Sequence, residues 1–133
     1  MVNPANEVDL LVKEKLIPFR ERIVDAIAAK HPMLISILDA ILMAKSNRIG
    51  LEVTDGGAAV GRYTLHLKGI RIAEVEFDKL DPAVHHPLLG LIRPAVSVER
   101  RTIEALLADE DRIREEPFSS IARHLPGVTI RFL

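Results

Sequence analysis

The stretch RIGLEVTDGGAAVGRYTLHLKGIRIAEVEF, residues 48–77, decides the fold class. Apolar side chains occupy every second position, as in Ile49, Leu51 and Val53, which is the period of a half-buried strand. Turn-forming residues interrupt the alternation after residues 54 and 67. The stretch therefore predicts an antiparallel meander of three strands, near residues 49–53, 61–68 and 70–77. In the third strand the apolar phase slips after Ile72, which indicates either a bulge or a strand buried on both faces.

An amphipathic helix is expected before this meander. Apolar residues recur at steps of three and four over residues 8–30, which is the period of a helix with one buried face. Pro18 lies inside this pattern. Because proline has no N–H and its ring clashes with the carbonyl four residues back, we expect a kink or a break near Ile17. His31-Pro32 separates this helix from a second one, because the residue before a proline avoids helical angles.

The second helix, MLISILDAILMA over residues 33–44, is apolar on nearly every side. A surface helix of a small protein normally shows one apolar stripe and one polar face. We therefore expect this helix to be covered by the core, by a partner chain or by a bound apolar molecule. Asp39 allows two interpretations. It marks a solvent-facing line with Ser36 and Met43, or it is a polar anchor at the mouth of an apolar pocket.

The second half of the chain predicts more strands and helices. Residues 78–94 contain three prolines and a glycine, so an irregular link with buried leucines is expected. A strand at 95–98, a helix at 99–108, a charged connection at 109–116, a helix from Pro117 and a last strand at 128–132 follow. Since a helical crossover joins the last two strands, we expect them to be parallel.

The fold class expected from this order is α+β. One five-stranded mixed β-sheet should carry helices packed on one face, with two extra helices at the N-terminus. The chain of 133 residues is expected to be a single domain, with a helical segment at 1–47 and a sheet with crossover helices at 48–133.

Composition argues against several classes of partner. The net charge of −1 creates no field that would attract nucleic acid, and only one Tyr and four Phe are available for base stacking. The chain has no cysteine and begins without the basic and apolar pattern of a signal peptide. Its longest apolar run is shorter than the roughly 20 residues that cross a bilayer. We expect a cytoplasmic protein without a membrane span.

Catalytic motifs are weak. His85 and His86 could both reach a metal from a loop, but no carboxylate or histidine at helical spacing completes a ligand set. Asp78 and Asp81 are close in sequence and could do so. No GxSxG motif is present, and the glycines of TDGGAAVG lie between two strands rather than before a helix. We therefore expect no catalytic residue, no metal and no cofactor. A small hydrolase or isomerase that uses His85, His86 or Asp39 remains an alternative.

From residue 48 onward the chain resembles the SCP-2 (sterol carrier protein 2) lipid-transfer domain family. The likeness rests on the order of LEVTDGG, RYTLHLKG, VSVERRTIEALLADED, PFSSIARHL and GVTIRF. It departs from the family where Ala108-Asp109 replaces a glycine after the paired leucines, and in the longer link before the fourth strand. It also departs in lacking a helix after the last strand, which in many members closes an apolar tunnel.

The resemblance implies a non-enzymatic protein that binds or carries a fatty acid, an acyl chain or another lipid. We expect the cavity between the sheet and two apolar segments, residues 33–44 and 88–92. Its expected walls are Ile37, Ile41, Tyr63, Leu65, Leu89, Ile103 and Leu107. The alternative is a ligand-free homodimer with a structural or regulatory role, in which the apolar helix buries itself against its twin.

Overall fold

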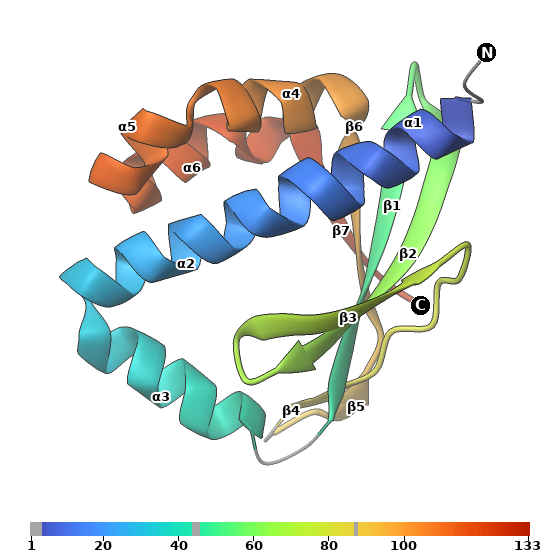
Figure 1. The fold of residues 1–133 in the computed structure, drawn as a ribbon. Helices are drawn as coiled ribbons and strands as arrows, with labels where there is room; N and C mark the ends of the chain where they lie inside the picture. The colour runs from blue at the N-terminus through green and yellow to red at the C-terminus, as the bar shows by residue number, and fades with distance from the viewer. Residues whose placement is uncertain (1–3, 44–45, 87) are drawn as a thin grey trace.

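The protein is described by a computed structural model that covers residues 4–43, 46–86 and 88–133. A five-stranded mixed sheet forms one layer, and helices cover one of its faces (Figure 1). The expected α+β class is confirmed, and so are two helices before the sheet.

The sheet contains all five expected strands. They are β1 (Asn47–Asp55), β2 (Ala58–Lys68), β3 (Arg71–Phe77), β6 (Pro94–Glu99) and β7 (Val128–Phe132), in the spatial order β3-β2-β1-β6-β7. The first three form the antiparallel meander, and β1 pairs with β6 in parallel. The register of β2 and β3 shifts by one residue at Ala73, so the bulge interpretation of the phase slip is confirmed.

The expected parallel pairing of the last two strands is wrong. β6 and β7 are antiparallel, with Val98 opposite Val128. Three helices join them, α4 (Arg100–Ala108), α5 (Glu110–Glu115) and α6 (Pro117–His124), followed by the short 3-10 turn η2 (Leu125–Gly127). The chain runs outward through α4 and α5 and returns through α6 (Figure 1). It therefore re-enters the sheet at the end where β6 left it. The charged connection expected at 109–116 is largely the helix α5.

The N-terminal helix continues through the proline. α1 (Pro4–Leu10), the π-helical segment η1 (Leu11–Leu16) and α2 (Ile17–Lys30) follow one rod in Figure 1, so the break expected near Ile17 is absent. A π-helical segment bonds each N–H to a carbonyl five residues back instead of four. Pro18 then falls in the first turn of α2, where proline is tolerated. α3 (Pro32–Met43) follows; Ala44 and the side chain of Met43 lie outside what the structure describes.

The link at 78–94 is more ordered and less buried than expected. It contains a hairpin, β4 (Val84–His86) with β5 (Gly90–Ile92), that forms a separate two-stranded sheet. A bridge between Arg48 and Ala83 connects this segment to β1. Leu88 and Leu89, which we expected to be buried, are 89% and 71% exposed because they occupy the tip of this hairpin.

Two buried clusters lie between the helices and the sheet. The larger joins α1 and η1 to the sheet and α4, and its buried members are Val8, Val12, Leu51, Val53, Tyr63, Val98 and Ile103. The smaller joins α2 to the C-terminal helices through Phe19, Ile23 and Ile113. The two clusters fix the long helix over the sheet at one end and beside α5 and α6 at the other.

Candidate apolar-ligand site

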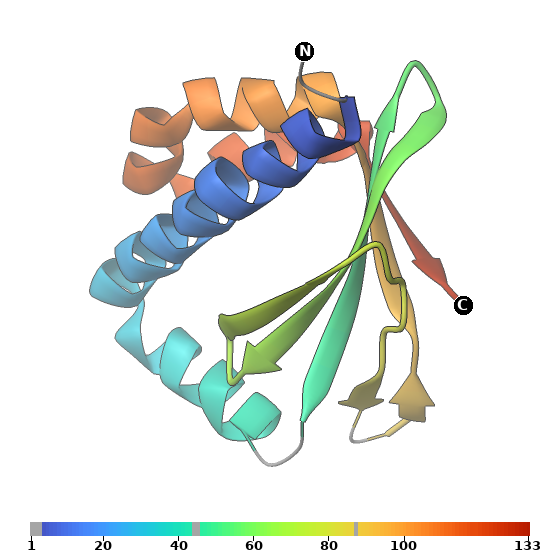
Figure 2. The same ribbon diagram turned by 45° about the vertical axis from the view of Figure 1, so that its right-hand side comes forward.

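An apolar cavity of about 340 Å³ lies beneath the long N-terminal helix. Toward its C-terminal end this helix leans away from the sheet (Figure 2), and the lining residues of the cavity come from both. Helices contribute half of its lining: Leu16, Ile17, Phe19, Arg20, Ile23, Leu106 and Ile121. The sheet contributes the other half: Ile49, Gly50, Leu51, Leu65, Leu67, Ile72 and Val96.

Sequence periodicity explains why these residues share one space. Leu16, Phe19 and Ile23 are spaced by three and four, so they lie on one face of the helix. Leu65 and Leu67 are two apart and point to the same face of β2. The cross-strand register sets Ile49 opposite Leu65. Apolar faces of helix and sheet therefore meet at the cavity.

The bulge in β3 brings one more residue to the cavity wall. With Ala73 as the extra residue, Ile72 pairs with Leu67 and Val75 pairs with Leu65. In a regular strand, residues on one face are two positions apart. Ile72 and Val75 are three positions apart, yet both pair with residues on the same face of β2. Ile72 can therefore line the cavity while Val75 packs against the larger core cluster.

Arg20 is the one ionisable residue in the lining, beside twelve apolar side chains and Gly50. Its side chain is 34% exposed, and its Nη1 donates to Oε1 of Glu21 at 3.3 Å. Burial by the apolar surroundings lowers the pKa of the Arg20 guanidinium, and the neighbouring Glu21 carboxylate opposes this change. An arginine keeps its charge in proteins at neutral pH. The cavity therefore carries a fixed positive charge at one point of an otherwise apolar wall.

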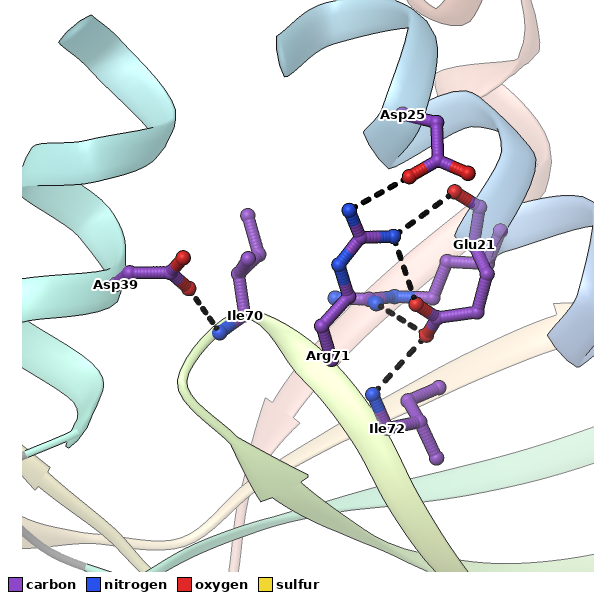
Figure 3. Close-up of polar contacts among 7 residues, drawn as sticks. Glu21, Asp25, Asp39, Ile70, Arg71 and Ile72 are labelled. Atoms are coloured by element: carbon purple, nitrogen blue, oxygen red, sulfur yellow. Dashed lines mark hydrogen bonds and ion pairs between the residues drawn. The ribbon is translucent and has the colours of Figure 1, made fainter. Parts of the chain in front are cut away.

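The turn between β2 and β3 is bound to α2 (Figure 3). The Arg71 guanidinium donates to Glu21 Oε2 at 3.1 Å and to Asp25 Oδ1 at 2.6 Å, and both carboxylates come from α2. Glu21 Oε1 also accepts the backbone N–H of Ile72 at 3.0 Å. These hydrogen bonds raise the pKa of the Arg71 guanidinium. The turn is thus held against the helix that roofs the cavity.

Asp39 makes a contact that neither of its two interpretations anticipated. Its Oδ1 accepts the backbone N–H of Ile70 at 2.8 Å, and the residue is half-buried (Figure 3). It does not line the cavity, whereas Ser36 on the same helix is exposed. The carboxylate satisfies the N–H of a turn residue and so connects α3 to the β2–β3 turn.

The expected cavity walls do not come together around this cavity. Of the residues named from the sequence, Leu65 lines it. Tyr63 and Ile103 are fully buried in the larger cluster, and Leu107 packs against both clusters. Ile37 and Ile41 on α3 and Leu89 in the β4–β5 hairpin are 53%, 49% and 71% exposed. This cavity lies beneath α2.

Sequence reasoning named Leu65 alone among the lining residues, and the roof that it missed belongs to the long helix. Leu16, Phe19 and Ile23 carried a visible signal, the helical period of residues 8–30, which indicates core packing equally well. Arg20 gave a weaker signal: it is a charged residue directly after Phe19, which lies on the apolar face of this helix. Sequence periodicity shows which side chains face inward, but it cannot show that helix and sheet diverge enough to leave a cavity.

Tyr63, in the core cluster beside the cavity, makes a hydrogen bond to the N-terminal helix. Its hydroxyl donates to Oδ1 of Asp9 at 2.6 Å. Burial, the hydrogen bond to Asp9 and the charge of Asp9 together raise the pKa of Tyr63. A neutral, fixed hydroxyl of this kind holds α1 on the sheet and is a structural contact.

The two neighbouring histidines have structural contacts. His86 Nδ1 accepts the backbone N–H groups of Leu88 and Leu89, both at 3.0 Å, and so stabilises the hairpin tip. The backbone N–H of His85 donates to Oδ1 of Asn47 at 2.8 Å. In the described part of the chain, no three residues of the His, Asp or Glu type gather where a metal ion could bind.

The outer face of α3 exposes an apolar stripe. Met33, Ile37 and Ile41 are spaced by four residues and are 75%, 53% and 49% exposed. Among the side chains of this helix that the structure describes, Ile35 is the buried apolar one. α3, which its sequence led us to expect to be covered, therefore leaves much of its apolar surface exposed in the single chain.

Comparison of the sequence with models of known protein families finds no matching family, and comparison with curated proteins finds no match. Within residues 4–43, 46–86 and 88–133, no helix combines the length and the apolar character needed to cross a membrane.

Proposed function

We propose that the protein binds one apolar chain, such as the hydrocarbon tail of a lipid, in the cavity beneath α2. The observation that carries this proposal is a cavity of about 340 Å³ whose wall is apolar apart from one arginine. Small-molecule sites are typically apolar pockets of about 300–1,000 Å³ with a few polar groups that set orientation. The chain's resemblance to the SCP-2 lipid-transfer family favours the same function.

The size of the cavity suits a medium-length tail. At roughly 30 Å³ for each methylene-sized group, by analogy with a water molecule's share of liquid volume, it holds about ten such groups. Burial of eight methylenes gains about 6 kcal/mol, at about 0.8 kcal/mol for each, before the cost of ordering the chain. A gain of about 6 kcal/mol corresponds to a Kd of roughly 40 μM. Burial of the tail alone therefore supports weak, reversible binding, and the proposed role is that of a carrier.

Filling the cavity tests this function. In Leu65→Trp a larger ring replaces a side chain of the cavity wall. We expect binding of the neutral fluorescent probe N-phenyl-1-naphthylamine to weaken at least about tenfold, which corresponds to two lost methylene contacts. Leu91→Trp adds the same ring on the exposed β5 and is the matched control. Fluorescence titration, with displacement by 1-decanol, measures both variants.

Two results would contradict the proposal. One is the absence of saturable probe binding to the wild type. The other is equal affinity for the probe in wild type, Leu65→Trp and Leu91→Trp, because binding would then occur outside the cavity.

Self-association is a second candidate function, favoured by the apolar stripe on α3. Met33, Ile37 and Ile41 would be buried if two copies packed this helix against each other. The protein would then use the fold for assembly, with or without a ligand. A sedimentation experiment that gives the mass of one chain over a wide concentration range excludes this candidate.

A further inference from the structure

Arg20 occupies an unusual position for a charged side chain. It stands in the wall of the cavity between Phe19 and Ile23, which are members of the smaller core cluster, and the remainder of the wall has no charged side chain. A charge that is partly removed from water is unfavourable unless an opposite charge or strong hydrogen bonds compensate for it. The position therefore favours an anionic partner.

Within the described chain, the carboxylate of Glu21 pairs with Arg20, but other donors share it. Glu21 Oε1 accepts the N–H of Ile72 at 3.0 Å as well as Arg20 Nη1 at 3.3 Å. Glu21 Oε2 accepts from Arg71 at 3.1 Å. The longer of the two bonds to Oε1 is the one from Arg20, and Glu21 keeps two donors when Arg20 turns away.

Arg20 has donors to spare. A guanidinium carries five N–H groups in a planar fork, and among the described residues Arg20 uses this fork for Glu21. Arg71, by contrast, binds both Glu21 and Asp25. A planar carboxylate can accept two parallel N–H bonds from one guanidinium, which is the strong, directional pairing that arginine favours.

We infer that Arg20 determines which molecules the cavity selects, by pairing with the carboxylate of a ligand whose tail fills the apolar space. This inference rests on the proposed function and adds the class of ligand, a medium-chain carboxylic acid in its ionised form. The head lies at the partly exposed guanidinium and the tail points between α2 and the sheet. Arg20 exchanges the long bond to Glu21 for the ligand's carboxylate, while Glu21 stays bound to Arg71 and Ile72.

The experiment compares an acid with the alcohol of the same length. Decanoate and 1-decanol each displace N-phenyl-1-naphthylamine from wild type, Arg20→Gln and the control Lys13→Gln, which removes an exposed positive charge from the same rod. We expect Arg20→Gln to weaken decanoate at least about tenfold, as the loss of a charge-assisted pair implies. Decanol should change less than about twofold in either variant, because its tail contacts are the same.

The outcomes separate the two proposals. Equal decanoate affinity in wild type and Arg20→Gln overturns the role of Arg20, while decanol binding to both keeps the carrier function. Failure of the probe, decanoate and decanol to bind the wild type overturns both proposals together.

A measurement on the wild type decides the case if Arg20→Gln does not fold. The Nε–Hε signals of the arginines are followed by NMR, with the Arg20 signal assigned from Arg20→Lys. Decanoate should shift the Arg20 signal and decanol should leave it in place. A saturating amount of decanoate that shifts no arginine signal overturns the inference.

Discussion

Asp39 illustrates how a carboxylate becomes acceptable in an apolar helix. Its Oδ1 accepts the backbone N–H of Ile70, so the carboxylate satisfies a hydrogen-bond donor of the β2–β3 turn. The sequence marked Asp39 as unusual because it is one of two polar residues in residues 33–44. It could not identify the partner, since Ile70 lies 31 residues away and the bond depends on the crossing of α3 and the β2–β3 turn.

Replacing Asp39 by alanine should destabilise the fold. The N–H of Ile70 loses its acceptor, at a cost of about 1 kcal/mol in the free energy of unfolding. Asp39→Asn keeps a side-chain oxygen and should lose less, and Ser36→Ala on the exposed side of α3 is the control. Urea denaturation measures all three. Equal stability of Asp39→Ala and Ser36→Ala would show that this contact contributes nothing.

At the scale of elements, the strands were predictable and their pairing was less so. The alternation of Ile49, Leu51 and Val53 fixed β1, and the slip after Ile72 marked a real bulge. The direction of β7 was not predictable in this way. Whether β7 runs with or against β6 depends on how many times the connecting helices traverse the layer, and the apolar periods of α4 and α6 do not record this.

Helix contacts explain a further difference. α2 is joined to α5 by Arg22, whose guanidinium donates to both carboxylate oxygens of Glu110 at 2.8 and 2.7 Å. The hydrogen bonds from Arg22 hold the pKa of Glu110 below its ordinary value and raise the pKa of Arg22. The charged stretch at 109–116, which was expected to be a connection, therefore contains a helix that pairs with α2. Local patterning missed this because the partner, Arg22, lies 88 residues away.

Acid should weaken this helix pair. Because the pKa of Glu110 is lower in the folded chain, its stabilising effect is complete above the ordinary value of about 4.5 and is lost as the pH falls through the folded value. Wild type should therefore exceed Glu110→Gln in stability near pH 7, and the difference should vanish in acid. Glu74→Gln, at an exposed site on β3, is the control. Urea denaturation at several pH values measures the difference, and a difference independent of pH would contradict this account.

At the scale of the whole molecule, the proposed function depends on the divergence of α2 from the sheet. Two buried clusters hold the long helix at separate places, and the cavity is lined by members of both, including Leu51 from the larger and Ile23 from the smaller. Leu65 was predictable as a wall residue from strand alternation. That α2 covers the cavity was not predictable, because α3 has the more apolar sequence and was expected to cover it. α3 instead leaves Met33, Ile37 and Ile41 exposed.

Native mass spectrometry of the freshly purified wild-type chain tests the central claim most directly, because it weighs the protein together with what it holds. We predict one small apolar molecule for each chain, released on mild activation and lost from Leu65→Trp but retained by Leu91→Trp. A wild type that carries no such molecule, or a molecule equally present in Leu65→Trp, would contradict the account.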